Sequence, residues 1–262
     1  MNPTSKIYVA DTEGKTQIDT GKKIDDLTKN RLYRAKGAII ETKPASNASM
    51  VFSNGTGVYF DVNTRVRVSE FDQEAFRANR TDLEDEPSVS RMNLNIEHGV
   101  IGISTSRLVA GSSMEFDTPQ AKAFIRGRQS VIQVGDNFTE ISMLLGEATV
   151  QCGPLDQGHL VKSGQQIIIR AGIGAGPNAV QVRQIEDGNA EEHEQWLEER
   201  VLTADAARKL VYFEVQTRLD GGITVFDGEP TDLSGREIVA IPVVPINPPV
   251  QPTISAANLV GR

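Results

Sequence analysis

The stretch GSSMEFDTPQAKAFIRGRQSVIQVGDNFTEISMLLGEATVQ, residues 111–151, decides the fold class of this chain. It contains five segments with the character of short β-strands, at 114–117, 121–125, 130–134, 139–145 and 147–151. Apolar side chains recur at every second position in several of them, as at Ala121, Ala123 and Ile125. A pleated strand with one buried face requires this alternation, so the stretch predicts a β-rich core.

The same alternation extends the β prediction over most of the chain. Further strand candidates lie at 7–10, 16–19, 37–41, 48–52, 58–60, 65–71, 92–97, 100–104, 158–161, 166–170 and 179–185. We expect 16–19 to pair with 7–10, since only a short turn separates them. The chain is therefore predicted to be mainly β, with stacked antiparallel hairpins of solenoid-like or sandwich character.

Glycine marks three of the expected turns. Asn54-Gly55 is the strongest hairpin signal, because both residues accept positive φ at the centre of a two-residue turn. His98-Gly99 is expected to turn the chain between two strands. Ser163-Gly164 is expected to close a hairpin between 158–161 and 166–170.

The character of the sequence changes after residue 187. Asn189 can cap a helix whose first turn is acidic, as the helix dipole prefers. Its body carries a narrow apolar stripe for docking, formed by Trp196, Leu197, Val201 and Leu202. Thr203 or Asp205 is expected to cap a second helix, and 210–216 fits helix or strand equally well. His193 is expected on the exposed side of the first helix, among glutamates.

The proline-rich tail reads as extended polypeptide, because proline fixes φ and removes a backbone donor. The predicted organisation is an all-β domain over 1–187, a helical segment over 188–220 and this tail over 221–262. An extended apolar part of the tail could add a strand to a sheet edge, in its own molecule or another. The candidate contact residues there are Ile238, Val239, Ile241 and Val243.

Composition excludes several classes of function. The net charge of −8 and the pI near 5.0 disfavour nucleic acid, whose affinity for proteins depends on clustered Lys and Arg. Cys152 is the only cysteine, so no internal disulfide forms, and by itself it cannot build a thiolate metal site. We expect it to be a half-buried thiol at a strand end. The chain has no apolar run long enough to span a membrane, and its start lacks the apolar region of a signal peptide.

Motifs for catalysis or ligand binding are not found. No pair among His98, His159 and His193 has metal-ligand spacing, and no nucleophile elbow is present. The glycine-rich segment 171–178 leads into a strand rather than a helix, so it is not expected to hold phosphate. The acidic residues Asp82, Glu84, Asp85 and Glu86 are expected in a solvated loop rather than a calcium site. We therefore predict no catalytic, cofactor or metal site, and no enzyme.

Three groups of residues resemble the pattern of the FecR-like family, over about residues 7–171. The first comprises 37–42, 48–52, Asn54-Gly55-Thr56 and Asn63-Thr64; the second Phe116-Asp117-Thr118-Pro119 and Arg126-Gly127; the third 144–150 and 161–166. The resemblance implies an all-β extracytoplasmic module, in the periplasm or on the cell surface, that works by protein–protein contact. In that family the module often forms the sensor half of a regulator of sigma factors, and the matching residues are scaffold.

These observations favour a non-enzymatic scaffold that binds a protein or an envelope component. Arg126 and Arg128 flank a glycine and are candidates for contact with an acidic partner, and Trp196 is a candidate on the helix. Two alternatives stay open: a carbohydrate-binding or carbohydrate-acting β protein, and a self-assembling structural protein.

Overall fold

In the computed structural model, the described residues are 5–75, 84–153, 155–172, 177–185 and 190–210. They form a mainly β fold followed by one helix, as predicted. The elements are β1 (Lys6–Glu13), β2 (Thr16–Asp19), β3 (Ile24–Asp26), β4 (Leu32–Arg34), β5 (Ile39–Thr42), β6 (Asn47–Phe52), β7 (Gly57–Phe60), β8 (Arg65–Gln73), β9 (Ser90–Ser104), β10 (Ser113–Asp117), β11 (Lys122–Val134), β12 (Phe138–Gln151), β13 (His159–Lys162), β14 (Gln165–Arg170), β15 (Ala179–Gln184) and α1 (Ala190–Leu210).

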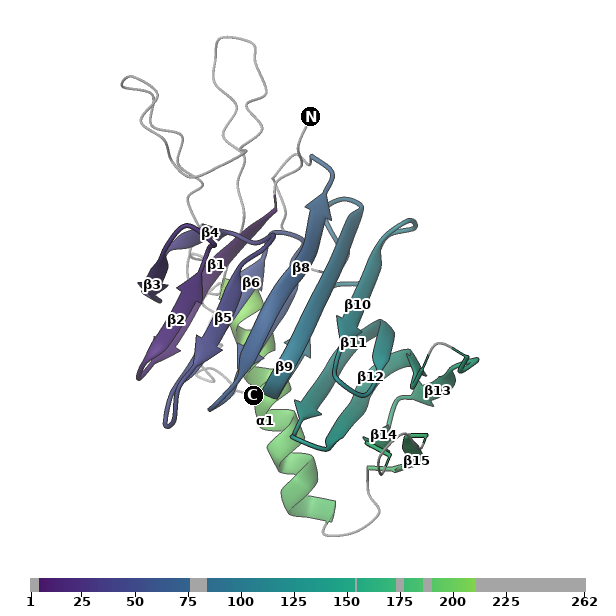
Figure 1. The fold of residues 1–262 in the computed structure, drawn as a ribbon. Coiled ribbons are helices and arrows are strands. Elements are labelled where there is room, and N and C mark those ends of the chain that lie inside the picture. Colours follow the sequence, from purple (N-terminus) through teal and green to yellow (C-terminus); the bar gives the residue numbers. More distant parts are fainter. Residues whose placement is uncertain (1–4, 76–83, 154, 173–176, 186–189, 211–262) are drawn as a thin grey trace, which may run out of the picture.

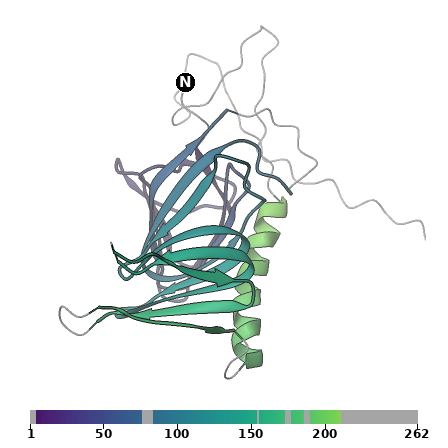
Figure 2. The ribbon, with the colours of Figure 1, turned by 90° about the vertical axis from the view of Figure 1, so that its right-hand side faces the viewer.

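The strands form one continuous sheet that folds over into two layers (Figures 1 and 2). The helix-side layer, on whose outer face α1 lies, has the strand order β4-β1-β6-β7-β9-β11-β12-β14-β15. The opposite layer has the order β3-β2-β5-β8-β9-β10-β11-β12-β13. Strands β9, β11 and β12 belong to both layers, since each has different neighbours along its two halves. Among the strands that the structure describes, every pairing is antiparallel except that of β9 with β10.

Glycine bends the long strands where a break was predicted. Residues 92–97 and 100–104 lie in one strand, β9, and Gly99 bends it with φ +100°. A Cβ atom on Gly99 would lie 2.4 Å from Thr64 Cα, so no other residue fits there without a shift. The predicted pairs of strands 121–125 with 130–134, and 139–145 with 147–151, likewise merge into β11 and β12. The turns predicted inside β9, β11 and β12 were wrong. At each of these positions the chain bends from one layer into the other and continues in the same strand.

The crossing between layers also overturns two predicted pairings. β2 pairs with β3 and β5 rather than with β1, and β13 and β14 pair with β12 rather than with each other. The hairpin at Asn54-Gly55 is confirmed by the register Met50↔Val58. Of its two central residues only Gly55 has positive φ, +87°.

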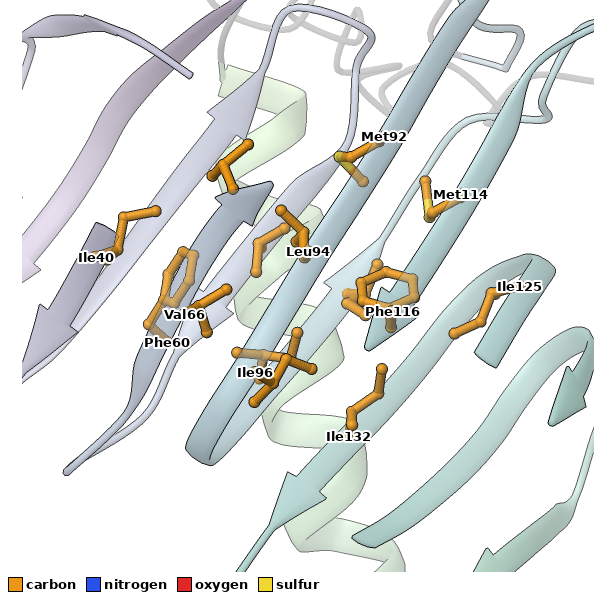
Figure 3. Packing of buried hydrophobic residues seen from close by; sticks show 14 of the residues in the cluster. Ile40, Phe60, Val66, Met92, Leu94, Ile96, Met114, Phe116, Ile125 and Ile132 are labelled. Carbon is orange, nitrogen blue, oxygen red and sulfur yellow. The ribbon is translucent and has the colours of Figure 1, made fainter. Parts of the chain in front are cut away.

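The main core lies between the two layers. It receives side chains from both, including Phe60 and Ile132 of the helix-side layer and Leu94 and Phe116 of the opposite layer (Figure 3). Phe52 and Phe71 meet edge to face with ring centroids 5.3 Å apart. Each buried aromatic or aliphatic side chain of this kind contributes about 1.5–3 kcal/mol to folding, so the core is the principal source of stability.

One acidic residue expected in a solvated loop is buried. Glu86 is 4% exposed and accepts hydrogen bonds from the hydroxyls of Ser90 and Ser112 and from Val109 N. These three donors compensate part of its desolvation. Because Glu86 is buried, its placement in a solvated loop was wrong. Asp82 lies outside the described residues.

The helical segment forms a single helix where two were expected. Thr203 and Asp205 lie inside α1, and the Thr203 hydroxyl donates to Glu199 O (2.7 Å) instead of capping a new helix. Residues 211–216 and the tail residues Ile238, Val239, Ile241 and Val243 lie outside the described residues. Within the part of the chain that the structure describes, no helix is long and apolar enough to cross a membrane.

Candidate partner-binding surface

Two glycines let α1 lie unusually close to the helix-side layer. Gly57 on β7 and Gly102 on β9 stand on adjacent strands, where Gly102 pairs with Tyr59. A Cβ atom on Gly57 would lie 2.2 Å from Ala204 O, and one on Gly102 would lie 2.6 Å from Arg200 O. Any side chain at either position would therefore collide with the helix backbone.

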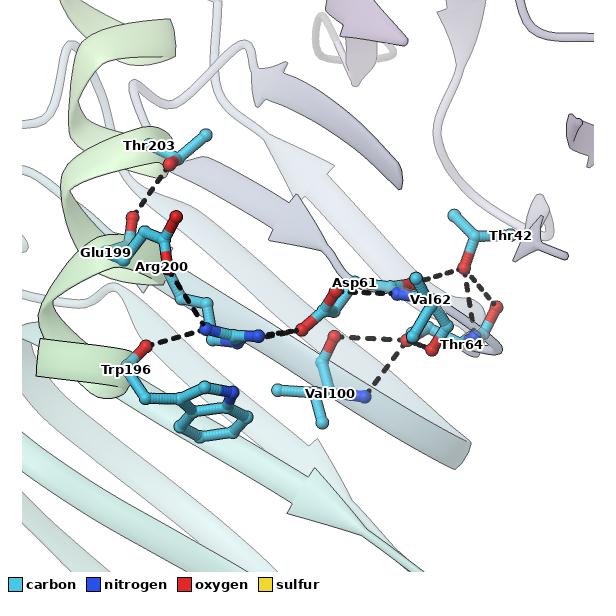
Figure 4. Close-up of polar contacts among 9 residues, drawn as sticks. All are labelled: Thr42, Asp61, Val62, Thr64, Val100, Trp196, Glu199, Arg200 and Thr203. Atoms are coloured by element: carbon cyan, nitrogen blue, oxygen red, sulfur yellow. Dashed lines mark hydrogen bonds and ion pairs between the residues drawn. The ribbon is translucent and has the colours of Figure 1, made fainter. Parts of the chain in front are cut away.

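An ion pair fixes the middle of α1. Arg200 Nε donates to Asp61 Oδ2 (2.8 Å), and its Nη1 donates to Trp196 O (2.8 Å) (Figure 4). The guanidinium also lies over the Trp196 ring, 3.8 Å from the centroid. Asp61 itself stands where the chain leaves β7 for the opposite layer, and its backbone oxygen accepts a hydrogen bond from Thr42. The helix is thus tied to a point that joins the two layers.

A second polar cluster fixes the C-terminal part of α1. The Ser104 hydroxyl donates to Asp205 Oδ1 (2.8 Å), and Arg208 donates to Gly55 O (3.2 Å) and to Ser106 Oγ (3.0 Å). Burial alone would raise the pKa of Asp205, but hydrogen bonds from Lys209 and Ser104 outweigh it and the pKa is lowered. Arg208 is only 4% exposed, so the helix end is held by a buried cation with several acceptors.

The N-terminal part of α1 meets β12, β14 and β15 through a cluster around His193. Its Nε2 lies 3.5 Å from Glu140 Oε1, and its ring stacks on Trp196 with centroids 6.0 Å apart. The Gln166 amide is assigned so that its nitrogen donates to Glu140 and its oxygen accepts from Arg183. Burial raises the pKa of Glu140, although the positive charges of His193, Arg183 and Arg170 oppose this shift. The expectation of a solvated His193 was wrong, because the helix turns this side chain toward the sheet.

Beside this cluster lies a groove of about 310 Å³, called here the helix-edge groove. It is lined by Gln129, Leu144, Gly164, Ile185, Glu194, Glu198, Val201 and Leu202. Ile185 and Val201 are buried, Leu202 is 60% exposed, and the two glutamates are exposed. The groove therefore combines an apolar wall with acidic side chains facing solvent, and its volume is near the lower limit for a binding site.

The predicted contact residues Arg126 and Arg128 lie at the bend of β11, and Arg128 directly precedes Gln129 of the groove. Arg126 is exposed and Arg128 is half-buried. Among the described residues neither forms an ion pair, so both cations are available at this bend of β11. Trp196, the predicted contact on the helix, is partly buried between Arg200 and His193. Of the predicted apolar stripe, Leu197 and Val201 are buried against the sheet and Leu202 is left exposed.

The structure also brings together a group of metal-ligating side chains that we did not predict. Cys152, Asp156 and His159 gather in the segment that joins β12 to β13. The spacing C-x3-D-x2-H is visible in the sequence, but it contains a single histidine and so lacks the histidine-pair spacing typical of a metal site.

Comparisons with known proteins add little to this description. No family model matches the chain, and no curated protein matches it. Two crystal structures of a "putative anti-sigma factor from Parabacteroides distasonis" align with it at 16% identity and a TM-score of 0.44. The alignments cover 61% of this chain and 63% and 64% of the neighbours, so the chain spans less than two thirds of their length. A likeness of this size is too weak to assign a function.

Proposed function

We propose that this chain is a non-enzymatic β scaffold of the FecR-like kind, located outside the cytoplasm, that binds another protein and serves signalling. Its binding surface is the helix-edge groove together with the bend at Arg126 and Arg128. The partner fitted to it presents an apolar side chain for the groove and charged groups of both signs beside it. The carbohydrate and self-assembly alternatives stay predictions.

The observation that carries the proposal is the exposure of Leu202 beside an apolar wall. Leu202 lies on α1, which Arg200, Asp205 and Arg208 attach to the sheet by hydrogen bonds. Leu202 is nevertheless 60% exposed, next to buried Val201. An apolar side chain beside a preformed groove, with charged residues around it, has the composition of an interface. The edge of β15 supports this reading, since among the described strands β15 pairs only with β14.

The positions of the family-like motifs support the scaffold part of the proposal. Gly127 and Gly146 face each other where β11 and β12 bend, and a Cβ atom on Gly146 would lie 2.2 Å from Gly127 Cα. The Thr118 hydroxyl donates to Ala121 O (3.0 Å) in the turn between β10 and β11. These residues shape corners, and the motifs are therefore better explained by architecture than by chemistry.

Photo-crosslinking in the native cell tests the binding surface. A photoreactive residue is placed at position 202 and, as a matched control, at Ile24, which is 65% exposed on β3 at the other end of the sheet. We expect a protein adduct from position 202 and none from position 24, and Arg126→Ala with Arg128→Ala should weaken it. Equal adducts from both positions, or none from position 202, would contradict the proposed surface. Fractionation of cells carrying the full native gene tests the location, and the identity of the adduct tests the role in signalling.

A further inference from the structure

A compact set of nitrogen, oxygen and sulfur donors lies at the edge of the sheet farthest from β3 and β4. The Cys152 Sγ atom, a carboxylate oxygen of Asp156 and a ring nitrogen of His159 all lie within 4.8 Å of one another. His159 Nε2 is 3.4 Å from Asp156 Oδ2. All three side chains are half-buried, so they are partly shielded and still reachable from solvent.

The backbone holds these three residues in place. Cys152 directly follows β12, and His159 begins β13, where it pairs with Val150 of β12. Cys152 N donates to Asp156 Oδ2 (2.8 Å) and Gly158 N donates to Asp156 Oδ1 (3.0 Å), so the carboxylate is oriented before any ligand arrives. Asn178 Nδ2 donates to Cys152 O (3.4 Å) and to Gln120 O (3.0 Å) and ties the segment to the sheet.

From this arrangement we propose that Cys152, Asp156 and His159 form a binding site for a divalent transition metal of the Zn²⁺ class. Thiolate, imidazole and carboxylate are the protein ligands of zinc, and calcium and magnesium instead prefer oxygen donors. Zinc bonds of about 2.0–2.3 Å place tetrahedral ligand atoms roughly 3.3–3.8 Å apart. The His159–Asp156 separation of 3.4 Å is already in this range, and the other separations, all within 4.8 Å, require side-chain rotation to reach it. Three protein ligands leave a fourth position for water or for a donor from a partner.

Metal binding at this site must release a proton. Burial and the neighbouring Asp156 carboxylate raise the pKa of the Cys152 thiol to about 11, so the thiol is protonated at neutral pH in the metal-free protein. Zinc binds the thiolate, and the displaced proton goes to solvent. The apparent affinity should therefore rise about tenfold for each pH unit while the thiol is the only group that loses a proton.

Titration with Co²⁺ as a spectroscopic probe tests the site in the full chain, without a polyhistidine tag. Because the chain has one cysteine, a thiolate-to-cobalt charge-transfer band reports Cys152 alone. We expect this band with tetrahedral ligand-field bands, and we expect Zn²⁺ to displace Co²⁺ with loss of both. Cys152→Ser should abolish the charge-transfer band, and His159→Ala should weaken Zn²⁺ binding by at least about tenfold in calorimetry.

Two controls keep the test decisive. His98→Ala removes an exposed histidine on β9, outside the cluster, and should leave binding unchanged. Asp156→Asn removes the charge and keeps an oxygen for only one of the two backbone donors, Cys152 N and Gly158 N, so circular dichroism must first show a folded chain, and its Zn²⁺ affinity should then be reduced. Absence of the charge-transfer band in the folded wild-type chain, or equal Zn²⁺ affinity in wild type and Cys152→Ser, would overturn the proposal.

Discussion

Arg200 and Asp61 are separated by 139 positions in the sequence and form a hydrogen-bonded ion pair with 2.8 Å between Nε and Oδ2. Their side chains are 12% and 11% exposed, so both charges have lost most of their water. The pair joins α1 to the point where the chain passes between layers. Loss of this contact would therefore affect the packing of the helix and of both layers of the sheet.

Arg200→Gln should lower the free energy of unfolding by about 3 kcal/mol, because it leaves Asp61 charged, buried and without its partner. Asp61→Asn should cost a similar amount, and the double variant should cost less than the sum. Urea unfolding of the four proteins measures this coupling. Lys29→Gln, which breaks the exposed pair with Asp11, is the matched control and should change little. Additive costs would mean that the pair does not hold the helix.

Gly57→Ala and Gly102→Ala should each displace α1, because the new Cβ atom would lie within 2.6 Å of a helix carbonyl oxygen. We expect destabilisation of about 1–3 kcal/mol, as for other overpacked sites. Trp196 is the only tryptophan and stacks under Arg200, so its fluorescence reports the seating of the helix. Gly153→Ala is the control, since nothing lies within 4 Å of its added Cβ atom. Unchanged fluorescence and stability in both test variants would contradict the close packing.

The β content could be predicted from sequence, and the two-layer topology could not. Alternation of apolar residues depends on neighbours two positions away, so it identified β6, β10 and β15 with small errors at their ends. Whether a glycine reverses a strand or bends it depends on what lies against it. At Gly99 that neighbour is Thr64. Thr64 lies far from Gly99 in the sequence, so no local pattern predicts the contact. Turn residues therefore located the corners, and they predicted the pairing correctly at Asn54-Gly55 but not where the chain passes between layers.

The candidate surface was predicted only in part, for the same physical reason. Trp196, Leu197 and Val201 were found because they repeat at helical spacing. On the sheet, Asp61, Gly57 and Gly102 contact α1. No pattern in the sequence around these three residues predicts contact with a helix. The metal-ligand group differs, since Cys152, Asp156 and His159 lie within one short segment and a search for mixed donors would have found them.

Glu86 should make the stability of this protein depend on pH in the acid range. Burial raises its pKa above the ordinary value of 4.5, and hydrogen bonds from Ser112, Ser90 and Val109 only partly oppose this. The folded state then binds more protons than the unfolded state between 4.5 and the raised pKa, so its contribution to stability falls as pH rises through that window.

Comparison with Glu86→Gln isolates this contribution. As pH rises from about 4 to 7, the unfolding free energy of wild type should fall relative to that of the variant. Urea unfolding at a series of pH values measures it, with exposed Glu70→Gln as the control. A difference that is constant over this range would show that Glu86 titrates alike in both states.

Cys152 should react slowly with thiol reagents while the chain is folded and metal-free. Its pKa is raised from 9.0 to about 11, first by burial and then by Asp156. Below pH 9 the thiolate fraction is thus about a hundredfold smaller than in the unfolded chain, and the rate should fall accordingly. Kinetics of a chromogenic disulfide reagent, with and without urea, measure the ratio.

The pH profile separates this effect from simple shielding. If charge controls the rate, the folded-state rate should still increase with pH well above 9, and Asp156→Asn should accelerate the reaction near neutral pH because it removes a neighbouring negative charge. Asp11→Asn, at an exposed position of β1 near the other end of the strand order, should have no effect. A folded-state profile that levels off near the ordinary thiol pKa would show that access alone slows the reaction, and would remove the electrostatic link between Cys152 and Asp156.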